Sequence, residues 1–144
     1  MRLKKTQKGQ SMFEVVIAIF IIAMITISVV SLSTVSLSNA VFSRNKTLAN
    51  KYSQEAIEWI RGQREQNFTS FKANAVGTKC LNTLAFTAPP CQFIANIFKR
   101  EVTFTTTTVS GKTILQVDVK TYWDDSKGYH ESKYVTNFSD IRQK

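Results

Sequence analysis

An uncharged segment near the amino terminus limits what this chain can fold into more than any other feature. No Asp, Glu, Lys or Arg occurs from Val15 to Ser43, and residues 15–30 are almost entirely apolar. A helix over residues 15–35 would be about 31 Å long, enough to cross the hydrocarbon core of a bilayer. A single segment in lipid can satisfy its backbone only as a helix, so its many β-branched residues do not argue against one. The sequence therefore predicts a transmembrane helix over residues 10–35.

Basic residues before this segment predict its orientation. The chain carries a net charge of +9. Part of that charge lies immediately ahead of the apolar run, in Arg2, Lys4, Lys5 and Lys8. Lys and Arg beside a membrane span stay on the cytoplasmic side. We therefore expect a single-pass protein of the cytoplasmic (inner) membrane whose C-terminal domain lies outside.

The helical pattern continues past the apolar segment as an amphipathic helix over residues 36–68. Apolar residues recur there at spacings near three, four and seven: Leu37, Val41, Leu48, Tyr52, Ala56, Trp59 and Ile60. Charged residues on the other faces predict the ion pairs Lys51–Glu55, Glu58–Arg61 and Arg61–Glu65. No proline interrupts residues 10–68, so we expect a single helix.

Residues 69–96 are predicted to be a variable loop, because Gly77 and the Pro89-Pro90 pair lie there. The segment also holds the only two cysteines, Cys80 and Cys91, which have neither CxxC nor zinc-site spacing. In an exported domain they are expected to form a disulfide. The chain-entropy model gives such a bridge roughly 3 kcal/mol of stabilisation.

Residues 97–144 have the pattern of an antiparallel β-meander. Strands are predicted over 98–109, 113–123 and 129–138, with turns between them. The second strand alternates most clearly, with Val117, Val119 and Trp123 on one face and polar residues on the other. Together these patterns predict an α+β fold in which a long N-terminal α-helix packs on a small three-stranded antiparallel sheet.

Residues 1–9 form a short basic leader that ends in glycine. A secretory signal peptide is cut after its apolar segment. Here the candidate cleavage site, between Gly9 and Gln10, lies before that segment. Cleavage there would leave the whole anchor on the mature protein, and glycine suits the extended backbone that a protease needs.

Glu14 is placed at the threshold of the apolar segment. A carboxylate in a bilayer is costly, about 2.5–3.5 kcal/mol at the centre and less near the surface. It would lie in the first turn of the mature helix, where the dipole favours negative charge. Two explanations stay open: the free amino terminus of a neighbouring subunit neutralises it, or it simply reaches the lipid headgroups.

The segment KGQSMFEVVIAIFII resembles the N-terminal motif of type IV prepilins and of the pseudopilins of type II secretion. In that family a basic leader ends in glycine, and glutamate is the fifth mature residue. Gln10 would be the first mature residue and Glu14 the fifth. The close resemblance covers about 25 residues, judged by motif alone. The second half of the helix and the strands around Trp123 are more similar to minor pilins than to major ones.

The resemblance implies a structural, non-enzymatic protein that needs no cofactor. A prepilin peptidase would cut between Gly9 and Gln10 and methylate the Gln10 amine. A platform protein and an assembly ATPase would then move the subunit from the membrane into a filament with other pilin subunits, where Glu14 pairs with a neighbour's amino terminus. Two features depart from the family pattern. Gln10 stands where the family usually has Phe or Met as the first mature residue. The helix also lacks the proline at which many major pilins unfold locally in the filament, although residues 31–38 could unfold instead.

Other interpretations remain open at this stage. The chain could be a pseudopilin of type II secretion or DNA uptake, or a signal-anchored extracytoplasmic binding protein. A secreted module cut after Ala40 is a third alternative, because Ser38-Asn39-Ala40 faintly resembles a signal-peptidase site.

Enzymatic and ligand-binding motifs are weak. The single histidine, His130, lies on a predicted strand away from any cluster with metal-ligand spacing. The sequence contains no nucleotide-binding loop and no nucleophile elbow. Lysines, Arg100 and tyrosines 122 and 129 could form a nucleic-acid patch, but their scatter is typical of an ordinary solvated surface.

Overall fold

The computed structural model describes residues 12–109 and 112–139. The chain divides into two compact units, residues 1–42 and 43–144. We call the first the N-terminal unit and the second the head, and describe each by itself. Helix α1, Met12–Gln66, contributes residues to both.

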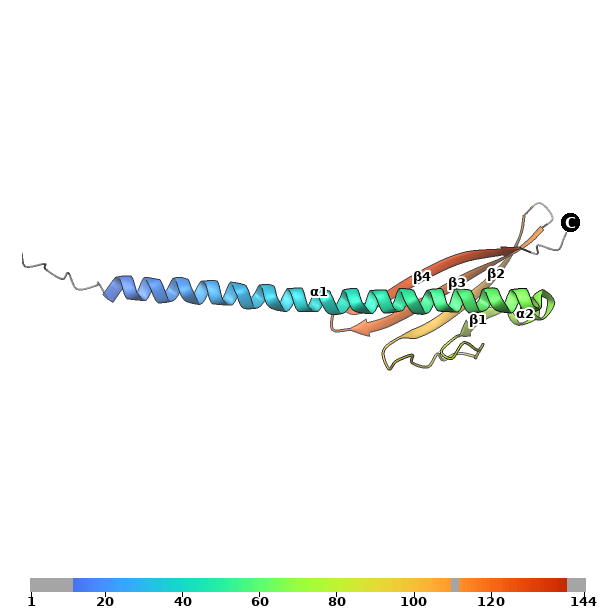
Figure 1. The fold of residues 1–144 in the computed structure, drawn as a ribbon, viewed down its shortest axis with the longest axis horizontal. Helices are drawn as coiled ribbons and strands as arrows, with labels where there is room; N and C mark the ends of the chain where they lie inside the picture. Colours follow the sequence, from blue (N-terminus) through green and yellow to red (C-terminus); the bar gives the residue numbers. More distant parts are fainter. Residues whose placement is uncertain (1–11, 110–111, 140–144) are drawn as a thin grey trace, which may run out of the picture. The chain divides into compact units, whose positions relative to one another are not determined.

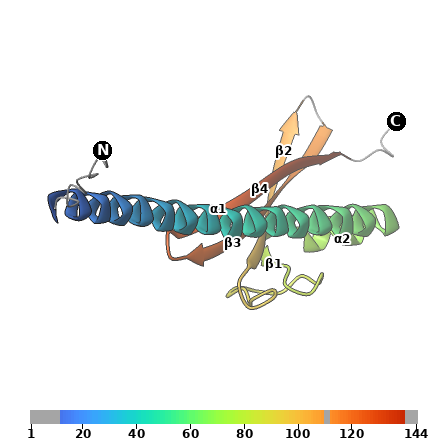
Figure 2. The same ribbon diagram turned by 60° about the vertical axis from the view of Figure 1, so that its left-hand side comes forward.

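The head combines the second part of α1 with a short helix and one antiparallel sheet (Figure 1). The elements after α1 are α2 (Phe68–Asn74), β1 (Gly77–Cys80), β2 (Lys99–Val109), β3 (Lys112–Asp125) and β4 (Gly128–Ser139). The strand order is β1-β2-β3-β4, with every neighbouring pair antiparallel. Within the head, α1 runs across one face of this sheet, as Figures 1 and 2 both show. The predicted α+β class, with a long N-terminal helix on an antiparallel sheet, is confirmed.

The prediction of three strands was wrong, because the sheet has four. The additional strand, β1, lies inside the segment 69–96 that was predicted to be a loop. It has only four residues and begins at Gly77, whose φ of 67° lies in the left-handed region that glycine adopts without a steric penalty. A strand this short has no room for an alternating pattern, so composition alone indicated a loop.

Helix α2 also lies in that predicted loop, and α1 ends two residues before the predicted boundary. Asn67 separates the two helices, because its backbone is extended (φ −156°, ψ 99°). Its side-chain Oδ1 accepts a hydrogen bond of 3.0 Å from the Ser70 N–H, which caps α2.

The buried face of α1 in the head is narrower and built from smaller residues than predicted. It consists of Ala49, Ser53, Ala56, Ile57 and Ile60. Ala56 and Ile60 were predicted correctly, and Leu48, Tyr52 and Trp59 lie half-buried at its margins. Small side chains let the helix backbone approach the sheet closely. Ser53 is tolerated there because its hydroxyl donates a 2.7 Å hydrogen bond to Thr121 Oγ1. Leu37 and Val41, predicted to belong to the same stripe, lie in the N-terminal unit and are exposed.

The sheet presents its apolar residues to α1 as the alternation predicted. On β3, Val117, Val119 and Trp123 are buried, and Phe138 of β4 is buried on the same face. Phe71 of α2 completes this core by edge contacts with Phe104 and Phe138. This main core is continuous across α1, α2 and three strands, and Trp123 belongs to a second cluster with Ala49 and Phe98.

Two valine-to-alanine substitutions test this assignment of faces. Val119→Ala should lower the free energy of unfolding by about 2–3 kcal/mol, because Val119 is fully buried on a central strand. Val135→Ala is the matched control, because Val135 is a strand residue that is 53% exposed, and its effect should be about 0.5 kcal/mol or less. Guanidinium unfolding of the full chain in detergent, followed by tryptophan fluorescence, measures both. Equal losses would contradict the assignment.

Candidate functional site

The residues predicted to take part in processing and assembly belong to the N-terminal unit. Gly9 and Gln10, the predicted cleavage and methylation sites, lie outside the described residues. Glu14 lies in the first turn of α1 and is exposed. A carboxylate there faces the positive end of the helix dipole, which stabilises its charge.

The rest of the N-terminal unit presents an apolar surface. From Met12 to Phe42 every residue except Ser38 is exposed. Most of its large apolar side chains, including Phe20 (62%) and Ile22 (63%), are more than half exposed. Among the described residues, α1 is the one helix long and apolar enough to cross a membrane. A helix that is apolar on all sides needs hydrocarbon or other helices around it, so this unit is compatible with a single-pass membrane anchor.

Four hydroxyl groups of the uncharged segment form hydrogen bonds inside α1. Four side chains donate to the backbone carbonyl four residues earlier, at 2.9–3.0 Å. They are Thr26, Ser28, Ser33 and Thr34. This geometry removes a free donor that would be costly in lipid. These four hydroxyls therefore do not prevent this helix from lying in a hydrocarbon environment.

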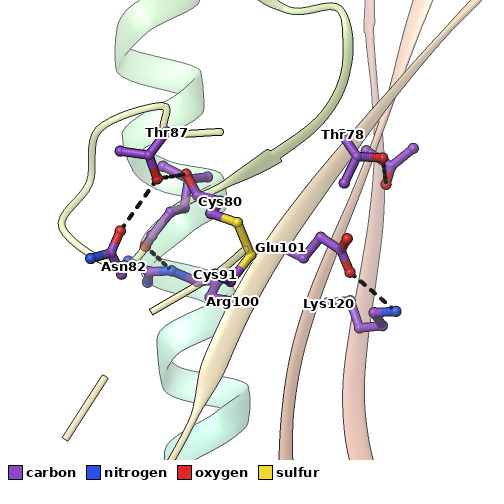
Figure 3. The surroundings of a disulfide bond; sticks show 10 residues. Thr78, Cys80, Asn82, Thr87, Cys91, Arg100, Glu101 and Lys120 are labelled. Atoms are coloured by element: carbon purple, nitrogen blue, oxygen red, sulfur yellow. Dashed lines mark hydrogen bonds and ion pairs between the residues drawn. A yellow bond between two sulfur atoms is a disulfide. The ribbon is translucent and has the colours of Figure 1, made fainter. Parts of the chain in front are cut away.

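The head contains the predicted disulfide between Cys80 and Cys91 (Figure 3). The two Cα atoms are 5.2 Å apart, and the residues are 11 positions apart in the sequence. Cys80 ends β1 and is fully buried. Its backbone also exchanges two hydrogen bonds with Thr87, at 2.8 and 3.0 Å. The disulfide and this bridge together close the segment that follows β1.

Arg100 of β2 lies next to this closed segment and is only 1% exposed. Its Nε donates to the Leu81 carbonyl at 2.7 Å, and its Nη1 donates to the Tyr52 carbonyl at 2.7 Å. Nη1 also forms an ion pair with Glu55 Oε2 at 3.1 Å. The guanidinium thus connects β2, α1 and the segment after β1. Burial lowers the pKa of Arg100, and the hydrogen bond and charge of Glu55 partly oppose that shift.

These contacts correct several expectations about the charged residues. Arg100 was counted among surface cations, but it is buried. Glu55 pairs with Arg100 instead of Lys51, and Glu65 approaches Arg64 (3.5 Å) instead of Arg61. The predicted Glu58–Arg61 pair is confirmed at 3.0 Å. Along β2, Arg100 lies on the same face as the buried residues Val102 and Phe104, because alternate residues of a strand share a face. That position was the one signal in the sequence that indicated burial.

His130 lies on β4, as predicted, and its Nε2 is 3.0 Å from Asp125 Oδ1. The Lys127 backbone N–H donates to the same oxygen at 2.7 Å, and this bond contributes most to lowering the pKa of Asp125. The His130 ring also packs against Trp123. Within residues 12–109 and 112–139, no group of three or more metal-ligating side chains is found. His130 therefore serves the β3–β4 turn in this structure.

Loss of the disulfide should destabilise the head. The chain-entropy model predicts that Cys80→Ser combined with Cys91→Ser lowers the free energy of unfolding by roughly 3 kcal/mol. Denaturant unfolding measured with and without reductant tests this. Reductant should destabilise the natural chain and leave the double variant unchanged, and an insensitive natural chain would contradict the prediction.

Removal of the Arg100 guanidinium should lower the free energy of unfolding more than neutralisation of its ionic partner, Glu55. Arg100→Ala should lower stability by about 3 kcal/mol, because it leaves the buried Leu81 carbonyl without its donor and opens a cavity. Glu55→Gln should cost about 1 kcal/mol or less, because the Glu55 side chain is 48% exposed and an amide oxygen can still accept. The same unfolding measurement compares the two variants. If Glu55→Gln costs as much as Arg100→Ala, the ion pair rather than the carbonyl contacts holds the head together.

Comparisons with known proteins leave the family of this chain open: it matches no protein-family model, no curated protein and no solved structure.

Proposed function

We propose that this chain is the precursor of a type IV pilin-like subunit, most similar to minor pilins, that is built into an extracellular filament. One observation carries the proposal. Residues 15–30 of the helix are exposed and almost entirely apolar on all sides, and within residues 12–42 the single charged residue is Glu14 in the first turn. Such a surface is stable only in lipid or among other apolar helices.

Processing would follow the order that the leader suggests. A prepilin peptidase cleaves between Gly9 and Gln10 and methylates the new amino terminus. The subunit then waits in the cytoplasmic membrane with its head outside. An assembly ATPase and a platform protein move it into the filament, where the N-terminal helices of neighbouring subunits replace the lipid.

Glu14 would provide a contact that fixes the axial position of one subunit against its neighbour, which the apolar surface does not do. Hydrophobic packing alone fixes no axial position between two smooth apolar helices. A carboxylate in apolar surroundings strongly favours a cationic partner over none. In the filament that partner is the amino group of residue 10 on a neighbouring subunit.

A second candidate function, a signal-anchored binding protein outside the cell, is favoured by the separate compactness of the head. In that protein the leader would remain attached and Glu14 would only face the headgroups. Amino-terminal sequencing of the membrane-extracted chain separates the two. A first residue of Gln10 supports the filament subunit, Met1 supports the anchored protein, and Val41 indicates a secreted module.

Substitution of Glu14 tests the assembly step. Glu14→Gln should reduce incorporation into sheared filaments by about tenfold or more, because a hydrogen bond to a charged group contributes about 1.5–3 kcal/mol. Glu58→Gln is the matched control, since Glu58 is an exposed glutamate on the same helix within the head, and it should assemble normally. Unchanged incorporation of Glu14→Gln, at equal membrane abundance, would overturn the proposed role. A minor subunit is also expected to be scarce among the filament proteins.

A further inference from the structure

Helix α2 runs beside the last turns of α1 (Figures 1 and 2). Side chains of these two helices line a small polar cavity that opens to the surface. Its volume is about 250 Å³. Four carboxamide side chains line it: Gln63 and Gln66 from α1, Asn67 between the helices, and Asn74 at the end of α2. The cavity is formed entirely within the head.

Two of these carboxamides are held in place by the backbone and keep one polar group available. Asn67 Oδ1 accepts from the Ser70 N–H at 3.0 Å, which leaves the Asn67 NH₂ group available. Asn74 Nδ2 donates to the Ser70 carbonyl at 3.0 Å, which leaves its side-chain oxygen available. The side-chain amides of Gln63, which is half-buried, and Gln66, which is exposed, form no hydrogen bond with another residue of the described ranges 12–109 and 112–139 and so face water. The cavity thus offers several donors and acceptors to a ligand.

Phenylalanine side chains form the apolar part of the wall. Phe86 lines the cavity and is fixed by edge contacts with Trp59 and Phe104, at ring-centroid distances of 4.9 and 5.5 Å. Phe71, only 3% exposed, is held in the core. The rings are therefore positioned before any ligand arrives, which reduces the ordering cost of binding.

The lining excludes several classes of ligand. It contains no charged side chain in the described part of the chain, so nothing there would compensate a phosphate, a carboxylate or a metal ion. Carboxamides also disfavour a lipid tail, because their hydrogen bonds to water would be lost. The remaining class is an uncharged ligand with several hydrogen-bonding groups and a small apolar surface.

We propose that this cavity binds an uncharged, N-acetylated sugar residue of a glycan. The acetamido group has one N–H donor and one carbonyl acceptor, which complement the donor and acceptor of a carboxamide. Its methyl group suits the phenyl wall, and ring hydroxyls can bond to the remaining amides. The cavity is smaller than the 300–1,000 Å³ usual for drug-sized ligands, which fits a single sugar ring. The proposal does not depend on filament assembly, since every residue that it uses belongs to the head.

The test is a titration of the full chain with the methyl glycoside of N-acetylglucosamine, followed by NMR of the side-chain amides. The chain is held in zwitterionic micelles, because detergents with sugar headgroups would compete. Saturating shifts are expected at the amides of Gln63 and Gln66. Gln63→Ala and Gln66→Ala should each weaken binding about fivefold, the effect of one neutral hydrogen bond. Gln92→Ala, which removes an exposed amide elsewhere in the head, is the matched control and should leave binding unchanged.

Three outcomes would overturn the proposal. The first is no saturable shift with the glycosides of either N-acetylglucosamine or N-acetylgalactosamine at about 50 mM, well above the millimolar range expected for so few contacts. The second is saturable shifts located away from the cavity in the natural chain. The third is equal affinity for methyl glucoside, which lacks the acetamido group. The unfolding midpoint of each variant shows that a loss of binding is not a loss of folding.

Discussion

Arg100 lies where α1, β2 and the segment after β1 meet, and its hydrogen bonds end on two of those elements. A buried guanidinium costs several kcal/mol unless its donors find acceptors. The Leu81 and Tyr52 carbonyls can act as acceptors only if both chain segments are placed within tenths of an ångström. The disulfide holds Cys80, the neighbour of Leu81, and so fixes one of these positions. The packing of the head therefore depends on this one cation being satisfied.

Polar contacts also determine how α1 lies on the sheet. Apolar burial favours contact but gives little axial specificity. Four pairs along the helix supply it: Ser53 with Thr121, Asn50 with Ser132, Gln54 with Tyr134, and Lys46 with the Glu131 carbonyl. All four join α1 to β3 or β4. Small buried residues allow the close approach, and these hydrogen bonds select one position along the helix.

The sequence predicts the regular parts of this protein better than the irregular ones. Alternation of apolar and polar residues located β3 and its buried face, and proline-free periodicity located α1. β1 was missed because four residues carry too little periodicity, and α2 because its signal is a single capping residue, Asn67. The Arg100 contacts depend on three segments distant in the sequence, so no local pattern encodes them. The amide-lined cavity is mostly local, because its residues lie between Gln63 and Asn74 apart from Phe86, but it depends on the helix break at Asn67, which the periodicity did not show. Glu14 and the leader form a contiguous motif that can be read directly.

The hydrogen bonds of Thr26, Ser28, Ser33 and Thr34 to their own helix have a consequence for how easily this segment changes surroundings. Lipid tails and leucine-like side chains are almost equally apolar, so exchanging one for the other involves little hydrophobic free energy. Hydroxyls that already have an acceptor add no barrier to that exchange. The free energy of the helix is thus nearly the same among acyl chains as among other apolar helices. Weak contacts that depend on geometry can therefore decide which environment it occupies.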